Sequence, residues 1–325
     1  MTQMKLWNGR EVPRIGLGCW AIGGPNRNDG PSTYYGAVDD NQSRAALRLG
    51  YEMGARVFDT AAGYGAGHSE MLVGEEISGF DDAVIVTKFG YDVDFENKRT
   101  GPLNVTPEGI RKTLEGSRQR LKRDTIDLAL LHLNDMDPAE APGVFDTLET
   151  LVGEGLIAAY GWSTDFMPQA LSAVDYPHFV AFENDYNIFT PATELMALCA
   201  QKYKVSISRL PLAMGLLTGK YRPDTSMAKD DVRAQDHPWL RFFKDGHPSA
   251  EYLEKLDALR ALLTVDGRSL AQGALGWILA SSPQALPVPG FRSEAQVRDN
   301  LGTLEKGPLP DDVMAEIASA LAAFR

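Results

Sequence analysis

Short apolar runs alternate with amphipathic stretches along most of this 325-residue chain. Apolar runs that end in turn residues are typical of strands buried on both faces, and apolar positions at helical spacing are typical of helices packed on a core. From Ile15 onward we predict eight core strands, nearly all followed by a helix. This alternation implies a parallel sheet, and eight units in about 300 residues imply a closed (β/α)8 TIM barrel.

The predicted elements can be given by residue range. The strands are expected within residues 14–18, 56–59, 83–88, 124–132, 157–162, 179–183, 205–210 and 284–287. The helices are expected at 41–52, 68–77, 107–121, 141–154, 165–174, 191–202, 250–263, 269–280, 294–303 and 311–324. Thr106 is the expected N-cap of the third helix, with Pro107 at its first position.

Three other segments complete the predicted architecture. Asn8-Gly9 inside residues 5–12 predicts an N-terminal β-hairpin with a type I′ turn. Long loops at 19–40 and 221–248 are expected at the C-terminal face of the barrel, and loops of this length in a compact domain are usually functional or disordered. No internal boundary is visible, so residues 1–325 are expected to form one domain.

Composition and charge exclude several classes of function. The formal net charge is −12, which argues against nucleic acid and anionic membranes as partners, because both require a basic face. Two cysteines, Cys19 and Cys199, are too few for a disulfide framework and are expected to be reduced thiols. We expect a cytoplasmic protein without a metal site, because no signal sequence, long apolar run or metal-ligand spacing is present.

Polar residues recur where the predicted strands end. They are Asp59, Lys88, His132, Ser163, Glu183 and Arg209. In an α/β barrel these ends meet at one rim, where active sites are built. Tyr64 lies on the loop after the second strand, between Gly63 and Gly65. Each residue alone has a structural explanation, such as a solvated strand end, but their joint placement favours a shared site.

The order and spacing of these motifs resemble the aldo-keto reductase family over essentially the whole chain. The resemblance rests on Phe58-Asp59-Thr60-Ala61 with Tyr64-Gly65, Val86-Thr87-Lys88, Leu130-Leu131-His132, Gly161-Trp162-Ser163, Asp185-Tyr186-Asn187, Pro211-Leu212-Ala213 with Gly215 to Tyr221, and Pro289 to Ser293 with Gln296 and Asn300. It implies a catalytic tetrad of Asp59, Tyr64, Lys88 and His132. It also implies a substrate carbonyl held near Trp20, Tyr64 and His132.

The chemistry implied for the tetrad is carbonyl reduction by hydride transfer. Negative charge builds on the carbonyl oxygen and must be protonated as it forms. A tyrosine has a reference pKa of ~10, which a buried cation lowers toward a useful value. Lys88 is expected to supply that cation, and Asp59 to keep Lys88 charged and oriented. His132 would orient the carbonyl or help to relay the proton.

The resemblance also implies NADP(H) as the cofactor, although the sequence contains no phosphate-binding loop motif. Residues 63–68 resemble a dinucleotide-binding glycine motif but have His68 at the third glycine position, and residues 215–220 are one residue short of a P-loop. The implied cofactor ligands are Ser163, Glu183, Arg209, Leu212, Ala213, Gly215, Gly290, Arg292, Gln296 and Asn300. Arg292 lies just before a helix start, where a guanidinium and the helix N-terminus can share a 2′-phosphate.

Two positions depart from the family pattern. Glu183 stands where glutamine commonly binds the carboxamide, and Arg209 stands where an aromatic residue commonly stacks under the nicotinamide. A guanidinium can stack like a ring, but its charge disfavours the cationic oxidised ring. We therefore expect Glu183 and Arg209 to form a compensating pair. Thr164, where asparagine often follows the serine, is a smaller departure.

Three functions can be weighed against the sequence. The first is an NADP-dependent reductase or alcohol dehydrogenase for an aldehyde, ketone or sugar-like substrate, acting as a monomer or small homo-oligomer. The second is a slow, NADPH-binding redox sensor similar to potassium-channel beta subunits. The third, a cofactor-free lyase or isomerase, fits poorly with Arg292, Gln296 and Asn300. The substrate pocket is expected to combine Trp20, aromatic residues of the 19–40 loop and parts of the 221–248 loop.

Overall fold

Eight parallel strands form the centre of the computed structural model, which describes residues 2–27 and 30–324. They are β3 (Leu17–Gly18), β4 (Val57–Asp59), β5 (Val84–Phe89), β8 (Leu128–Leu131), β9 (Tyr160–Ser163), β10 (Phe179–Asp185), β11 (Val205–Arg209) and β14 (Ala285–Pro287). Each strand pairs with the next along the chain. Backbone hydrogen bonds from Gly16 to Pro287 (3.0 Å) and from Gly18 to Pro289 (3.1 Å) join the first strand to the last. The predicted (β/α)8 barrel is therefore confirmed.

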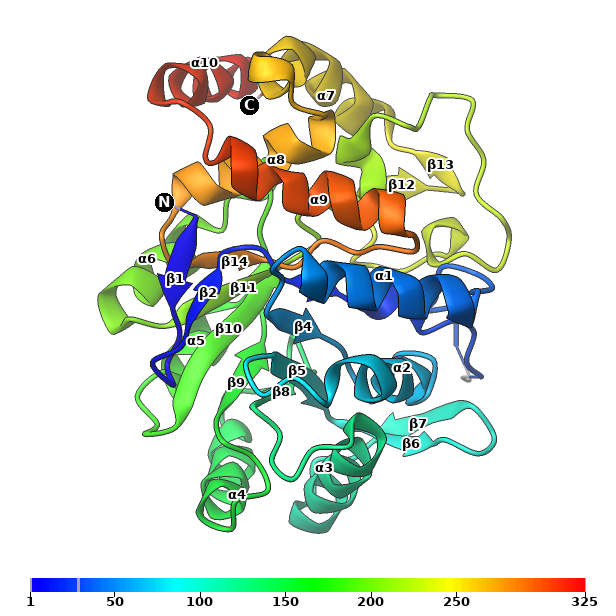
Figure 1. Ribbon diagram of the computed structural model, residues 1–325, viewed down its shortest axis with the longest axis vertical. Coiled ribbons are helices and arrows are strands. Elements are labelled where there is room, and N and C mark those ends of the chain that lie inside the picture. The colour runs from blue at the N-terminus through cyan, green and yellow to red at the C-terminus, as the bar shows by residue number, and fades with distance from the viewer. Residues whose placement is uncertain (1, 28–29, 325) are drawn as a thin grey trace.

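Helices surround this barrel, and two further helices lie outside the repeat (Figure 1). The surrounding helices are α1 (Asp40–Glu52), α2 (His68–Ile77), α3 (Pro107–Leu121), α4 (Ala141–Gly153), α5 (Met167–Ala173), α6 (Thr193–Lys202), α8 (Leu270–Ser281) and α9 (Glu294–Lys306). The additional helices are α7 (Ala250–Leu263) and α10 (Asp311–Ala322). Short 3-10 segments occur at Trp20–Ile22, Ala213–Thr218, Val232–Ala234 and Val265–Gly267.

Helix starts follow the capping chemistry of the sequence. The Thr106 side chain accepts a hydrogen bond from the backbone N–H of Gly109, and Pro107 is the first residue of α3, as predicted. Ser269 and Gln272 form a reciprocal capping box at the start of α8. Because such caps depend on neighbours in sequence, the pattern located these helix ends to within a residue or two.

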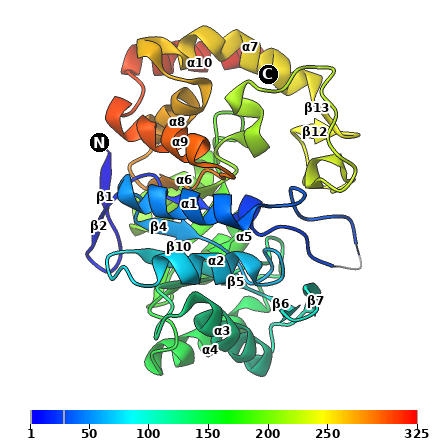
Figure 2. The ribbon, with the colours of Figure 1, turned by 45° about the vertical axis from the view of Figure 1, so that its right-hand side comes forward.

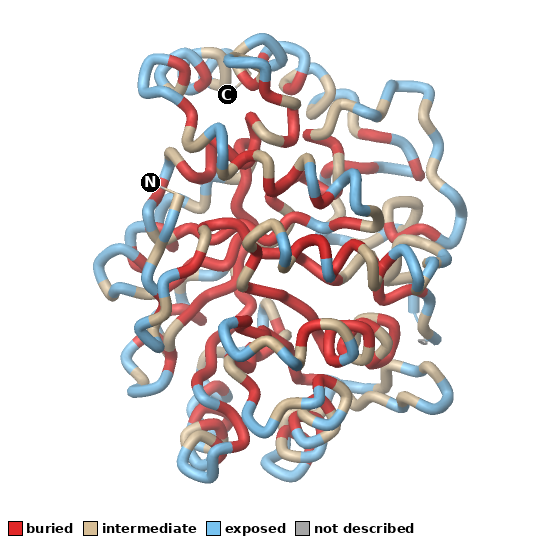
Figure 3. The backbone as a smooth tube through the Cα atoms, in the orientation of Figure 1, coloured by how far each residue is buried: buried red, intermediate tan, exposed pale blue. Residues whose placement is uncertain are grey.

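The barrel interior is closed at one end by the N-terminal hairpin. Strands β1 (Gln3–Lys5) and β2 (Glu11–Pro13) pair antiparallel, and Leu6 and Val12 join the buried cluster of valines and leucines inside the barrel. The eight barrel strands, in contrast to β1 and β2, are buried along nearly all of their length (Figure 3). The prediction of a type I′ turn was wrong, because this turn needs a positive φ at both Asn8 and Gly9, and only Gly9 has one (+82°). The backbone N–H of Gly9 donates to the carbonyl oxygen of Leu6. This is a three-residue connection closed by a left-handed glycine.

Three segments gather at the opposite end, near the C-terminal ends of the strands. They are the first long loop, the hairpin of β6 (Tyr91–Asp94) and β7 (Arg99–Leu103), and the 221–248 segment, which contains β12 (Phe243–Lys244) and β13 (His247–Pro248). Figures 1 and 2 show them on the side away from β1 and β2. Residues 28 and 29 of the first loop lie outside the described part. Neither small hairpin was predicted, because both are short and polar.

The Tyr64 loop packs backbone to backbone against the first long loop. Gly65 has φ +61°, and a Cβ there would lie 1.9 Å from the carbonyl oxygen of Gly23. A Cβ on Gly63, by contrast, would meet nothing within 4 Å. Glycine at position 65 is therefore needed both for the left-handed backbone and for the close approach that positions Tyr64.

We predict that Gly65→Ala lowers the free energy of unfolding by about 1–3 kcal/mol, because the backbone is strained and the Gly23 carbonyl must move. Gly63→Ala is the matched control and is expected to be nearly neutral. Urea unfolding of both variants measures the difference. Equal stability of the two variants would contradict the role assigned to Gly65.

Candidate active site

Lys88 is the centre of a buried polar cluster at the barrel mouth. Its Nζ donates to Asp59 Oδ1 at 2.6 Å, to the carbonyl oxygen of Thr60 at 3.0 Å and to the Tyr64 hydroxyl at 3.2 Å. The Lys88 side chain is fully buried and that of Asp59 is 5% exposed. The residues come from β5, the end of β4 and the loop before α2, so the structure brings these predicted residues together.

His132 completes the predicted tetrad through ring contacts. It follows β8 directly, and its ring meets the Tyr64 ring edge-on with the centroids 5.9 Å apart. Burial, together with the positive charges of Lys88 and Arg209, lowers the pKa of His132 to about 3. The imidazole is therefore neutral near pH 7, with one N–H donor and one acceptor nitrogen.

Glu183 is a second carboxylate on the same lysine. Its Oε2 lies 3.2 Å from Lys88 Nζ, and its side chain is 2% exposed. The contact is an ion pair without hydrogen-bond geometry, and this oxygen has no hydrogen-bond partner within the described residues. Two carboxylates thus face one ammonium in a buried site, which leaves a formal charge of −1 when all three groups are ionised.

Burial is the main influence on the pKa values in this cluster, and the second carboxylate adds to it. Burial, helped by the charge of Glu183, raises the pKa of Asp59 despite the neighbouring ammonium. The pKa of Tyr64 is also raised, because burial and the two carboxylates outweigh Lys88. The expected net lowering of the Tyr64 pKa is therefore wrong, and Tyr64 is held as a neutral phenol.

The expected pair of Glu183 and Arg209 is also wrong. Arg209 Nε donates to Asp185 Oδ1 at 2.7 Å, and its NH2 group donates to Asp165 Oδ2. Its NH1 group donates to Ser163 Oγ at 2.9 Å. The physical reason is register: Asp185, not Glu183, is the direct partner of Arg209 between β10 and β11. Strand β10 continues two residues beyond its predicted end.

Arg209 is consequently fixed by two carboxylates of its own, and Arg241 pairs with the second of them, Asp185. Burial alone would lower the pKa of Arg209, but Asp185, Asp165 and, to a smaller extent, Glu183 raise it above the ordinary value. Its side chain is 22% exposed, so part of the planar guanidinium faces outward at the mouth. Asp165 and Asp185 are positioning residues that sequence reasoning missed. The Asp185-Tyr186-Asn187 motif was noted, but its place opposite Arg209 required the strand register.

Aromatic side chains from both long loops surround Trp20. Its ring lies 4.8 Å from Tyr35, 6.0 Å from Tyr64 and 6.3 Å from Trp239 between centroids. The loops are hydrogen-bonded to each other, for example from Val232 N to Tyr34 O at 2.8 Å. The predicted convergence of Trp20, the first loop and the 221–248 segment is therefore found beside Tyr64.

The backbone after β11 is unusually strained. Leu210, Ala213, Met214 and Gly215 all have positive φ, between 48° and 90°. Left-handed conformations of non-glycine residues cluster at functional sites, and turns of this kind expose backbone N–H groups. Leu212, Ala213 and Gly215, expected to hold the cofactor, lie within this segment.

The remaining predicted cofactor residues gather at the start of α9. Gln296 Oε1 accepts from Arg292 N at 2.7 Å, and Asn300 Nδ2 donates to the carbonyl oxygen of Gly290 at 3.3 Å. The Arg292 guanidinium donates to the carbonyl oxygens of Tyr35 and Ala37. The segment is therefore tied to the same loop that carries the aromatic residues.

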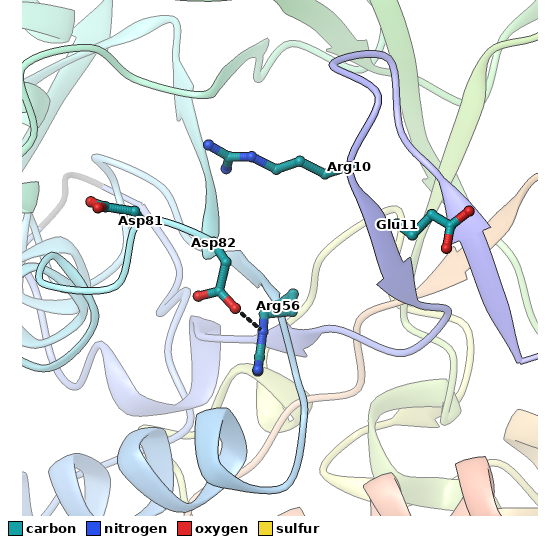
Figure 4. A pocket seen from close by; sticks show the side chains of 5 residues that line it. All are labelled: Arg10, Glu11, Arg56, Asp81 and Asp82. Carbon is teal, nitrogen blue, oxygen red and sulfur yellow. Dashed lines mark hydrogen bonds and ion pairs between the residues drawn. The ribbon is translucent and has the colours of Figure 1, made fainter.

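A separate cavity of about 360 Å³ lies at the N-terminal ends of the strands (Figure 4). It is lined by Arg10, Glu11, Arg56, Asp81 and Asp82. Its arginines are already paired, Arg56 with Asp82 at 2.6 Å and Arg10 with Asp127 at 3.6 Å. This cavity is not part of the Lys88 cluster.

The described residues contain neither a candidate metal cluster nor a candidate membrane-spanning helix. Across residues 2–27 and 30–324, no group of three or more His, Cys, Asp or Glu side chains is arranged to hold a metal ion. In the same part of the chain, no helix is sufficiently long and apolar to cross a membrane.

Known proteins resemble this chain along nearly its whole length. It is 27% identical over 322 residues to the aldo-keto reductase yakc [NADP(+)] of Schizosaccharomyces pombe, covering 95% of this chain and 88% of that protein. It is 29% identical over 328 residues to the NADH-specific methylglyoxal reductase of Escherichia coli, covering 95% and 96%. The solved glycerol dehydrogenase of Gluconobacter oxydans superposes with a TM-score of 0.81 at 27% identity, covering 99% and 96%.

A sequence profile described as the Aldo/keto reductase family matches residues 14–322. The match includes all eight barrel strands and the residues around Lys88 described above. The chain therefore belongs to the aldo/keto reductase family and is an oxidoreductase of that family.

Proposed function

We propose that this protein reduces the carbonyl group of an aldehyde, ketone or sugar-like substrate with NADPH, with Tyr64 as the general acid. The observation that carries the proposal is the hydrogen-bonded series Asp59–Lys88–Tyr64, with distances of 2.6 and 3.2 Å. A neutral phenol beside a buried ammonium can give a proton to a developing alkoxide, and the ammonium then stabilises the tyrosinate.

The proton and hydride steps have separate sources. A reduced nicotinamide would supply the hydride to the carbonyl carbon when bound. The electron pair of the C=O π bond moves to oxygen, and Tyr64 protonates that oxygen. The neutral imidazole of His132 offers an N–H to orient the carbonyl. The reverse reaction uses the same groups, with Tyr64 as the base for alcohol oxidation.

The protein offers suitable groups for such a dinucleotide. The orphaned Oε2 of Glu183 suits the N–H donors of a carboxamide, and Ser163 Oγ accepts from Arg209 yet keeps its own hydrogen to donate. The strained backbone of residues 210–215 suits a pyrophosphate, and Gly290, Arg292, Gln296 and Asn300 suit the adenosine end. These side chains and backbone groups are therefore suited to binding a nicotinamide dinucleotide.

The choice between NADP and NAD rests on Arg292. Its guanidinium can make charge-assisted bonds to a 2′-phosphate and still has five N–H donors to divide between phosphate and loop carbonyls. The relative from S. pombe is named for NADP+ and the one from E. coli as NADH-specific, so relatives of similar identity differ in this property.

For Tyr64→Phe we expect loss of carbonyl reduction by at least ~100-fold, because proton transfer by a positioned side chain contributes about that much or more. NADPH affinity is expected to change less than about threefold, since the ring remains. Stopped-flow absorbance of NADPH and fluorescence titration separate the two effects. Retained turnover would remove Tyr64 from the role of acid.

The same assay separates the reductase from a slow redox sensor. Wild-type protein is assayed with NADPH and a panel of aldehydes, ketones and sugars. Multiple turnovers with a member of the panel support the reductase. Tight NADPH binding with no consumption above background across the panel would favour the sensor.

Arg292→Ala is expected to weaken NADPH binding by about 10- to 100-fold, the loss expected for a hydrogen bond to a charged group, while NADH affinity changes little. Arg298→Ala is the matched control, because Arg298 lies on α9, the helix that follows Arg292, and its side chain is 61% exposed. Titrations of both nucleotides check the prediction. Equal weakening of NADPH and NADH would argue against a 2′-phosphate contact.

The ion pairs of Arg209 give a prediction that double mutants can test. Arg209→Gln and Asp185→Asn should be non-additive in the free energy of unfolding by about 0.5–3 kcal/mol, because they share a direct ion pair. Arg209→Gln and Glu183→Gln should show a smaller coupling. Urea unfolding of the single and double variants measures both. A larger coupling with Glu183 would restore the pair expected from the sequence.

A further inference from the structure

Glu183 is a second carboxylate beside an ammonium that Asp59 already pairs with, so the Lys88 cluster has one carboxylate more than it has cations. Lys88 is flanked by both Asp59 and Glu183, with O···N distances of 2.6 and 3.2 Å. On the other side of the mouth, Arg209 is already neutralised by Asp165 and Asp185, and Arg241 also pairs with Asp185. The excess charge therefore lies on the Lys88 side, within the buried part of the cluster.

A hydride donor cannot lie far from this charge. Tyr64 Oη and Glu183 Oε2 each lie 3.2 Å from the same Lys88 nitrogen. The carbonyl oxygen must reach Tyr64 to receive its proton, and reacting atoms must approach to about 3–3.5 Å. The ring carbon that delivers hydride to that carbonyl therefore lies within about 14 Å of the Glu183 carboxylate.

The charge of that ring changes during the reaction. A reduced nicotinamide ring is neutral and an oxidised one is cationic, so a fixed carboxylate favours the oxidised state and the positive charge that develops in the transition state. A glutamine in the same place would offer an acceptor oxygen but no charge. The difference between the two side chains is therefore electrostatic.

We propose that Glu183 tunes the redox balance of the bound cofactor, so that the protein binds NADP+ more tightly relative to NADPH than it would with a neutral side chain. The inference rests on the proposed function, because it requires a nicotinamide at the Tyr64 site. It makes Glu183 a residue that shifts the on-enzyme equilibrium toward the alcohol and oxidised cofactor.

The test compares dissociation constants of NADP+ and NADPH, measured by calorimetry and fluorescence, for wild-type protein, Glu183→Gln and Glu183→Asp. In Glu183→Gln the preference for NADP+ over NADPH should fall about tenfold, the effect of one charge at roughly this distance in an effective dielectric constant of ~20. Tenfold corresponds to a rise of about 30 mV in the two-electron potential of the bound cofactor. Glu183→Asp keeps the charge and should stay within about threefold of wild type.

The possible outcomes are distinct. Equal weakening of both nucleotides in Glu183→Gln, with the ratio unchanged, would show a merely structural role and overturn this inference alone. Failure of wild-type protein to bind either nucleotide would overturn the proposed function and this inference with it. Glu183→Asn, also neutral, repeats the measurement if Glu183→Gln does not fold, as judged by circular dichroism.

Discussion

The burial of one ammonium group at the mouth of the barrel is the constraint on which the site depends. An uncompensated lysine in this position would deprotonate, because burial disfavours its charged form. Asp59 and Glu183 reverse that effect, and the pKa of Lys88 is raised. Burial, assisted by the same two carboxylates, keeps the proton on Tyr64 by raising its pKa, so the state of the acid depends on the depth of the site and on how the cation is held. Removing either carboxylate changes both groups at once.

The barrel separates this charged cluster from the parts that stabilise the fold. At the N-terminal end, Leu6 and Val12 close an interior of aliphatic side chains. At the C-terminal end, polar groups replace them at the ends of β4, β5, β10 and β11. The loops that cover this end bond to each other and to Arg292, and the 221–248 segment also reaches the barrel through the ion pair of Arg241 with Asp185. Substitutions at exposed positions of these loops can alter the site without emptying the core, whereas Val232, Phe242 and Phe243 are themselves part of the core.

Features that depend on neighbouring residues were predictable from the sequence. The barrel and the limits of α2 and α7 follow from apolar spacing, and the start of α3 at Pro107 follows from the Thr106 cap. Features that depend on distant partners were not. The last two residues of β10 bring Asp185 beside Arg209. No local pattern distinguishes a strand ending at Glu183 from one ending two residues later. The direction of the Tyr64 pKa shift likewise required knowing that Glu183 faces the same lysine.

The two departures from the family pattern therefore solve different electrostatic problems. Arg209 introduces a cation at the strand end, and Asp165 and Asp185 fix it in one orientation. Because Arg241 also pairs with Asp185, two guanidinium groups balance these two carboxylates. Glu183 introduces an anion whose nearest partner, Lys88, already pairs with Asp59. The formal charge is therefore distributed unequally across the barrel mouth. Cations and carboxylates are equal in number around Arg209, whereas carboxylates are in excess around Lys88. A substrate or cofactor group bound in this site experiences that difference in charge. A direct ion pair between Glu183 and Arg209 would have removed the difference.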